Sequence, residues 1–156
     1  MAASPETVVV GNYWSESKPL LTVQSGDTVT IETVGTASVA ALERLNVPAN
    51  QIPESLRAIT RAMNDKTLDR GPGGHILTGP IFIEDADPGD VLELHIDKTT
   101  MPVPWAHNNF SPTSGFLKED FKQSFGRIIQ LDREHMVALF APGITIRLHP
   151  FFGSMG

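Results

Sequence analysis

The sequence contains no cysteine among its 156 residues. This absence excludes a disulfide scaffold, a zinc site with cysteine ligands and every enzyme class that uses a cysteine nucleophile. No apolar run approaches the roughly 18–20 residues that a membrane helix needs. The first ten residues, MAASPETVVV, lack the basic start and the apolar stretch of a secretory signal. We therefore expect a cytoplasmic protein without a membrane span.

Basic residues are also few. Lysine and arginine number 12 against 18 aspartates and glutamates, which gives a formal net charge of −6. No basic run interrupts this balance, and an acidic surface repels phosphate. Nucleic acid is therefore not an expected partner.

Turn-forming residues are abundant, with 13 glycines and 12 prolines, and 40% of the residues are hydrophobic. This composition predicts one mainly β domain over residues 1–156, a β-sandwich or barrel, with a helical insertion around residues 37–64. The spacing of Leu56, Ile59 and Met63 predicts the apolar face of the second inserted helix. The candidate strands are Thr7–Asn12, Leu20–Gln24, Thr28–Thr33, His75–Leu77, Ile81–Ile83, Val91–Ile96, Arg127–Leu131, Val137–Phe140 and Ile144–Leu148.

Two of these segments alternate strictly between apolar and polar residues. In Val91–Ile96 the alternation predicts that Leu92, Leu94 and Ile96 face the core. In Thr28–Thr33 it places Glu32 on a polar face, as a candidate site residue or as an ordinary solvated carboxylate. Residues 98–124 show no periodicity and predict a long loop.

The common catalytic signatures, such as G-x-S-x-G and H-E-x-x-H, are absent. The first unusual feature is GPGGH at Gly71–His75, where glycines permit close approach of the backbone to a ligand or to another segment. His75 could then bind a metal or transfer protons. A plain turn followed by a hydrogen-bonded histidine is the alternative.

The stretch WAHNNF contains an indole and two amides that can orient a small polar substrate, namely Trp105, Asn108 and Asn109. A loop that only folds onto the core is the alternative. Near the end of the sequence, Phe151 and Phe152 are adjacent, so on a strand they point in opposite directions and each needs its own apolar cover. This pair indicates an interface.

Several segments, taken in order, resemble the acetamidase/formamidase family. They are YW at 13–14 with PLLTVQSGDTVTIET at 19–33, GHILTGPIFI at 74–83, DPGDVLEL at 87–94, GFLKEDF at 115–121 and PFFGSMG at 150–156. The resemblance implies a β-sandwich-containing fold that hydrolyses the C–N bond of short linear amides, such as formamide or acetamide, to carboxylate and ammonia. It also implies a divalent metal, zinc, with His75 as ligand or proton shuttle and Glu32 as base or second ligand.

Members of this family continue well beyond the PFFGSMG signature, and their later half is expected to complete the site. We therefore expect this chain to correspond to the N-terminal half, with a C-terminal half or a second polypeptide covering Phe151 and Phe152. A noncatalytic β-sandwich module that binds a partner, or a truncated inactive homologue, is the alternative. We also expect a homo-oligomer, because unpaired strand edges invite pairing.

Overall fold

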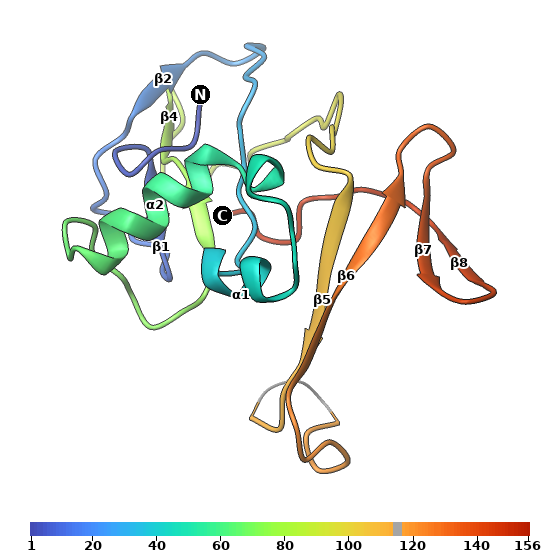
Figure 1. The fold of residues 1–156 in the computed structure, drawn as a ribbon. Coiled ribbons are helices and arrows are strands. Elements are labelled where there is room, and N and C mark those ends of the chain that lie inside the picture. The colour runs from blue at the N-terminus through green and yellow to red at the C-terminus, as the bar shows by residue number, and fades with distance from the viewer. Residues whose placement is uncertain (114–116) are drawn as a thin grey trace. The chain divides into compact units, whose positions relative to one another are not determined.

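The computed structural model describes residues 1–113 and 117–156. It contains short strands with a helical insertion between the second and the third (Figure 1). The strands are β1 (Val8–Val10), β2 (Leu21–Val23), β3 (Ile76–Thr78), β4 (Ile81–Ile83), β5 (Trp105–Phe110), β6 (Phe125–Asp132), β7 (Val137–Ala141) and β8 (Ile144–Arg147). The helices are α1 (Val39–Arg44), the 3₁₀ helix η1 (Ala49–Gln51) and α2 (Glu54–Asn64). The mainly β class and the helical insertion are confirmed.

The described strands form three small sheets. Strand β1 pairs antiparallel with β3, and β2 pairs parallel with β4. The third sheet is an antiparallel meander in the order β5-β6-β7-β8. The four strands pair in the order in which they follow one another in the sequence, so the antiparallel meander needs no crossover connection and forms from a single stretch of chain.

The chain divides into two compact units. The first unit comprises Met1–Val39, Pro53–Asp97 and Phe152–Gly156, and the second comprises Ala40–Ile52 and Lys98–Phe151. The single domain expected over residues 1–156 stays a prediction. Among the described helices, none combines the length and the hydrophobicity that crossing a membrane requires.

Helix α2 supplies the core of the first unit. Its residues Leu56 and Ile59 are buried, three positions apart on one face, as the sequence pattern predicts. Ile59 packs in a cluster with buried residues of β1, and Met63 packs against the same cluster. The helix therefore holds β1, and with it the residues that follow β1, in a fixed place.

The prediction of a loop over residues 98–124 is wrong for Trp105–Phe110, which forms β5. Histidine and asparagine disfavour strands in isolation, but strand formation depends chiefly on cross-strand neighbours. Here each residue of β5 lies opposite one in β6, from Trp105 opposite Gln130 to Phe110 opposite Phe125. Tertiary pairing therefore outweighs local preference.

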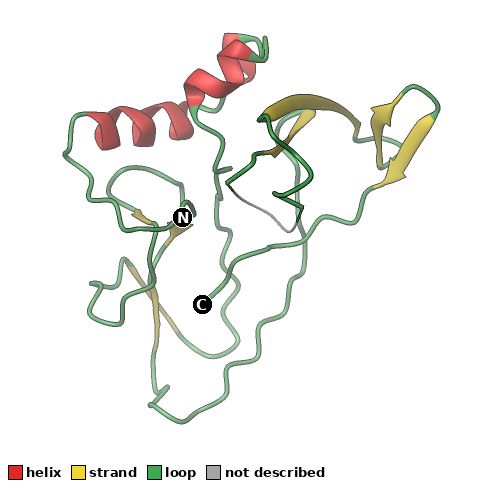
Figure 2. Cartoon of the chain, turned by 90° about the horizontal axis from the view of Figure 1, so that it is seen from below, coloured by secondary structure: helices red, strands yellow, loops and turns green. Residues whose placement is uncertain are grey.

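The predictions of strands at Thr28–Thr33 and Val91–Ile96 are also wrong, since both lie outside the strands and run as connecting chain (Figure 2). Leu92, Leu94 and Ile96, expected to face the core, are 55%, 61% and 52% exposed. The alternating pattern is present, but the described residues supply no neighbouring strand for either segment. A strand is a property of a pair, so the pattern alone does not create one.

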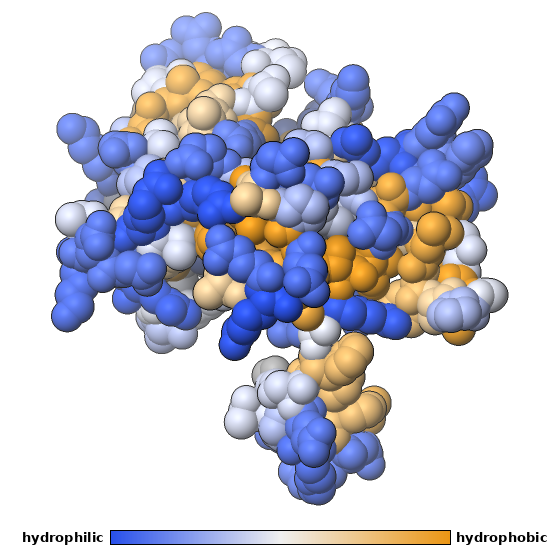
Figure 3. All heavy atoms as spheres, in the orientation of Figure 1, coloured by the Kyte–Doolittle hydropathy of each residue, from blue (hydrophilic) through white to orange (hydrophobic). Residues whose placement is uncertain are grey.

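Several apolar side chains remain open to solvent. Figure 3 shows apolar surface over β2 and β4 and, in the second unit, over β7 and β8. The exposed residues there include Leu20, Phe82, Leu139, Ile144 and Ile146. Exposed surface of this kind marks contact with another molecule or segment.

The adjacent phenylalanines near the end of the sequence differ in exposure. Phe151 is 82% exposed, whereas Phe152 is half-buried. The difference agrees with the expectation that neighbouring residues of an extended chain point in different directions. The cover expected for this pair stays a prediction.

Candidate active site

The glycine-rich loop at Gly71–Gly74 lies directly against the end of β1. The Gly71 N–H donates to the Val10 carbonyl at 2.8 Å, and the Gly73 N–H donates to the Gly11 carbonyl at 2.9 Å. In return, the Gly11 N–H donates to the carbonyl of His75 at 2.8 Å. Three backbone hydrogen bonds therefore fix the main chain immediately before His75.

This contact explains why the loop contains glycine. A Cβ on Gly73 would lie 2.6 Å from the Gly11 carbonyl oxygen, and one on Gly71 would lie 2.6 Å from Oδ1 of Asn12. Gly11 has φ +83°, a conformation that L side chains rarely adopt. A Cβ on Gly74, in contrast, meets nothing within 4 Å. The glycines therefore serve close contact between backbone segments of the first unit.

His75 is exposed, and one side chain approaches its imidazole. Nδ1 lies 3.5 Å from Oγ of Ser154, a residue 79 positions later in the sequence. The segment that carries Ser154 also approaches the start of the chain, because the Cβ position of Gly156 is 3.0 Å from the Tyr13 ring. The first unit thus brings the GPGGH segment and the PFFGSMG segment together at His75. Ser154 and Tyr13 lie in family-like motifs of the sequence, but neither is among the predicted site residues.

The hydrogen-bond partners of the Glu32 side chain are residues other than His75. Its carboxylate accepts hydrogen bonds from the Ala3 N–H at 3.1 Å and from Oγ of Ser55 at 2.7 Å. Ser55 lies in the first turn of α2, where a negative charge is favourable. The Glu32 carbonyl accepts from Oγ1 of Thr78, three residues after His75. Within residues 1–113 and 117–156 no hydrogen bond joins Glu32 to His75.

The three residues expected to shape a substrate pocket all lie on β5, in the second unit. Nε1 of Trp105 donates to the Gln51 carbonyl at 3.3 Å, which ties the indole to the end of η1. Because side chains alternate along a strand, Trp105 and Asn109 share one face and Asn108 lies on the other. The strand therefore brings two of the three together.

His107 lies between Trp105 and Asn109 on that face, and sequence reasoning did not single it out. Its Nε2 is 3.5 Å from the position of a Cβ on Gly126, the residue opposite Asn109 in β6. A Cβ at Gly126 would make ordinary van der Waals contact with the imidazole, so the two residues are neighbours in the sheet. The sequence does contain a signal for His107. It lies two residues after Trp105 and two before Asn109, and a strand places all three side chains on one face.

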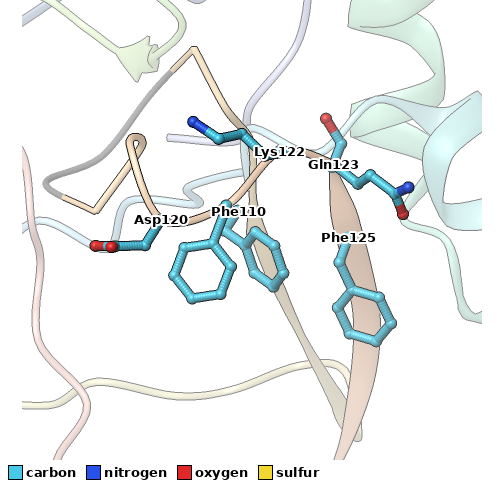
Figure 4. Close-up of a pocket in the computed structure, with 7 residues that line it drawn as sticks. Phe110, Asp120, Lys122, Gln123 and Phe125 are labelled. Carbon is cyan, nitrogen blue, oxygen red and sulfur yellow. The ribbon is translucent and has the colours of Figure 1, made fainter.

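An open pocket of about 430 Å³ lies where β5 and β6 meet the intervening loop (Figure 4). The Phe110 ring stacks on Phe125 at 5.7 Å and meets Phe121 at 4.5 Å. The charged ends of Asp120 and Lys122 point away from these rings. Of the GFLKEDF motif at 115–121, Gly115 and Phe116 lie outside the described residues. Three phenylalanines line the pocket, and Asp120 is the carboxylate among its lining residues.

A zinc site was expected at His75. Catalytic zinc takes three protein ligands. The part of the chain that the structure describes contains no group of three or more histidine, aspartate or glutamate side chains that could hold a metal. His75 is available as one ligand, so these residues alone do not fit a complete zinc site.

Comparison with known proteins agrees with the sequence motifs. The model of the Acetamidase/Formamidase family matches residues 3–156. A crystal structure of an acetamidase from Bacillus halodurans is similar in fold, with 17% sequence identity and a TM-score of 0.52. The match covers 95% of this chain and 43% of that chain, so this chain spans less than half the length of that acetamidase. No curated protein matches significantly. Since the family match runs through almost the whole sequence, the chain belongs to the acetamidase/formamidase family.

Proposed function

We propose that this chain is part of a hydrolase of short linear amides, such as formamide or acetamide, with carboxylate and ammonia as products. We further propose that a second polypeptide or a C-terminal portion completes the enzyme. The approach of Ser154 to Nδ1 of His75 carries the proposal. It joins two segments that resemble the family's motifs around an imidazole, a side chain that can both accept and donate a proton.

The proposed role of His75 is general acid–base catalysis. Nε2 takes a proton from the attacking water, whose oxygen bonds to the amide carbon, and returns that proton to the nitrogen as the C–N bond breaks. The backbone hydrogen bonds from Gly11 and Gly73 support this role, because they fix the main chain that carries the imidazole. The Ser154 hydroxyl orients the ring through Nδ1.

Glu32 is the proposed second acid–base group or ligand. Both of its carboxylate oxygens accept hydrogen bonds in the structure, from Ala3 and from Ser55. Each oxygen keeps a second acceptor site, so these bonds are compatible with a catalytic role. The alternative is a purely structural role, in which the Glu32 carboxylate connects Ala3 to Ser55 of α2. The Glu32→Gln experiment below distinguishes the two roles.

For the substrate we propose a wall formed by β5, with contacts from Trp105, Asn108 and Asn109. Support is greater for Trp105 and Asn109, which share a face, than for Asn108 on the opposite face. The indole N–H of Trp105 already donates to Gln51, so its contribution is apolar contact, whereas the Asn109 amide offers polar groups.

We propose zinc as the metal, with ligands on the completing polypeptide; His75 is a ligand only in the alternative arrangement, in which its imidazole binds the metal and does not transfer the proton. When bound, zinc supplies a Lewis acid that lowers the pKa of water to about 7. Because the described residues do not form a complete site, the steps assigned to His75 above do not depend on the metal. A cytoplasmic, homo-oligomeric enzyme remains the expected setting.

The test is ammonia release from formamide and acetamide by protein purified from its native source, so that any second polypeptide is retained. His75→Ala is expected to lose activity by roughly 10²-fold or more, as for other general acid–base groups. His149→Ala, at an exposed histidine of the second unit, is the matched control and should retain activity. Intact mass and zinc content are measured on the same samples.

Glu32→Gln separates the two roles of that residue. If Glu32 is catalytic, activity falls while urea stability stays close to that of the wild type, because glutamine keeps an acceptor oxygen for Ala3 or Ser55. If Glu32 is structural, activity and stability fall together.

Wild-type activity in His75→Ala would overturn the role of His75.

The alternative function is a noncatalytic module that binds a partner. The exposed Phe151 favours it, because a side chain this large and apolar at a surface marks an interface. This module would purify without stoichiometric zinc and would release no ammonia in any combination with its partner. The same assay therefore decides between the two functions.

A further inference from the structure

The segment Val91–Ile96 connects β4 and β5 and makes no strand in the structure (Figure 1). Its sequence, VLELHI, nevertheless has the alternation of a strand with one apolar face. Every residue from 91 to 96 is exposed, and Val91 is 93% exposed. The segment thus exposes its apolar side chains, and no other described part of the chain covers them.

Its backbone is open as well. In the described part of the chain, the backbone hydrogen bonds nearest to the segment end at Asp90, whose N–H donates to the Asp87 carbonyl. An extended segment with free N–H and C=O groups is a template for pairing with another strand. On the polar face, Nε2 of His95 lies 3.0 Å from Oε1 of Glu93, and both side chains are largely exposed.

We propose that Val91–Ile96 pairs with the same segment of a second copy of this chain, as an antiparallel two-strand junction centred on Leu94. In this register Leu94 lies opposite Leu94 of the partner subunit, and Leu92 lies opposite Ile96 of the partner subunit. On the other face, Glu93 lies opposite His95 of the partner subunit, and His95 lies opposite the partner's Glu93. One face becomes continuously apolar and the other carries two complementary pairs.

The neighbouring registers are worse. A slip of one residue in one direction places every apolar side chain of the segment opposite a polar one. In the other direction it does so for Leu92 and Leu94 and leaves only Val91 opposite Ile96 of the partner subunit. A slip of two residues in one direction places Glu93 opposite Glu93 of the partner subunit. In the other direction it places Glu93 opposite the partner's Asp97. Like charges directly opposite each other are destabilising, so charge and hydrophobicity select the same register.

A second copy is favoured over an unrelated partner because the segment is self-complementary. An isologous interface requires that one patch match itself under a two-fold rotation, and the Leu94-centred register meets this requirement on both faces. The proposal does not involve His75, so it stands or falls separately from the proposed amide hydrolysis.

Cysteine cross-linking tests the register directly, because the sequence contains no cysteine and any introduced thiol is unique. Directly opposed residues in an antiparallel pair have Cα atoms about 4.5–5.5 Å apart, within the range of a disulfide. Leu94→Cys should therefore form a covalent dimer under mild oxidation. Val91→Cys is the matched control, because the same register separates the two positions 91 by about 20 Å.

A mixture refines the test. Leu92→Cys and Ile96→Cys should cross-link with each other at least about tenfold faster than either does alone, since they are opposed only across the junction. Equal cross-linking of Leu94→Cys and Val91→Cys, or a wild-type chain that sediments as a monomer at every concentration, would overturn the proposal. The second result would assign the segment to a different polypeptide.

A charge swap provides an independent readout by sedimentation equilibrium. His95→Glu places a glutamate opposite a glutamate at two positions of the junction and should raise the dimer Kd on the order of tenfold. The double variant Glu93→Lys with His95→Glu restores opposite charges and should recover the wild-type Kd. Glu119→Lys, a charge change in the second unit, should leave the Kd unchanged. Failure of the double variant to recover would contradict the register.

Discussion

Adjacent glycines in the loop before His75 differ sharply in what a methyl group would meet. At Gly73 the added carbon would lie 2.6 Å from a backbone oxygen of Gly11, which cannot move without breaking the contact with β1. At Gly74 the same carbon meets nothing within 4 Å. The requirement for glycine therefore belongs to individual positions and not to the loop as a whole.

Gly73→Ala is expected to destabilise the chain by about 1–3 kcal/mol, the usual cost of overpacking. Gly74→Ala is the control and should change the free energy of unfolding by less than about 0.5 kcal/mol. Urea unfolding of both variants measures the difference. Equal losses at the two positions would show that Gly11 and Gly73 are not in close contact.

At the scale of secondary-structure elements, the turn of the β6–β7 hairpin contains a titratable side chain, Asp132. The pKa of Asp132 is lowered from its ordinary value of 3.8, first by the hydrogen bond from the His135 N–H and then by the His135 side chain. Nδ1 of His135 lies 2.8 Å from Oδ2 of Asp132, and Oδ1 accepts the backbone N–H. The ionised carboxylate therefore closes the turn.

Because folding lowers this pKa, its contribution to stability is present above pH 3.8 and is lost as the pH falls through the lower value of the folded state. We expect the backbone amide resonances of Glu134 and His135 to shift together in this acidic range. Asp132→Asn keeps an acceptor oxygen but does not ionise, so the acidic step should be absent. The same step in both proteins would assign the titration to another group.

The strands show what sequence periodicity predicts and what it does not. Ile81–Ile83 forms β4 with the predicted bounds, because three consecutive apolar residues lie beside β2. Val91–Ile96 has a clearer alternation but no partner, whereas Trp105–Phe110 has poor strand residues but a full partner in β6. The pattern reports which side chains could be buried together, and pairing decides which segments become strands.

The candidate site also has some features that the sequence predicts and others that only the fold creates. The glycines before His75 were predictable, because only glycine allows two backbones to approach so closely. The approach of Ser154 was not, since it depends on the fold bringing together residues 79 positions apart. The Glu32 carboxylate was assigned to a polar strand face, but its partners Ala3 and Ser55 come from other elements.

At the scale of the whole molecule, the two tryptophans report on different units. Trp14 belongs to the first unit and Trp105 to the second. We expect Trp105→Phe, which leaves Trp14, and Trp14→Phe, which leaves Trp105, to give different urea midpoints by fluorescence, because each unit has its own buried residues.

Adding Gly73→Ala to each single-tryptophan protein sharpens this test. The substitution lies in the first unit and should lower the midpoint reported by Trp14 while leaving that reported by Trp105 in place. Equal lowering of both midpoints by Gly73→Ala would show that the chain unfolds as one cooperative structure.

The open space beside Gly74 has a practical meaning for enzyme engineering. The backbone at this point is anchored from Gly11, Gly71 and Gly73, so a side chain placed at residue 74 would not displace the main chain that carries His75. Residue 74 is therefore a site for a saturation library, in which new side chains next to the imidazole could alter the amides accepted while the scaffold stays unchanged.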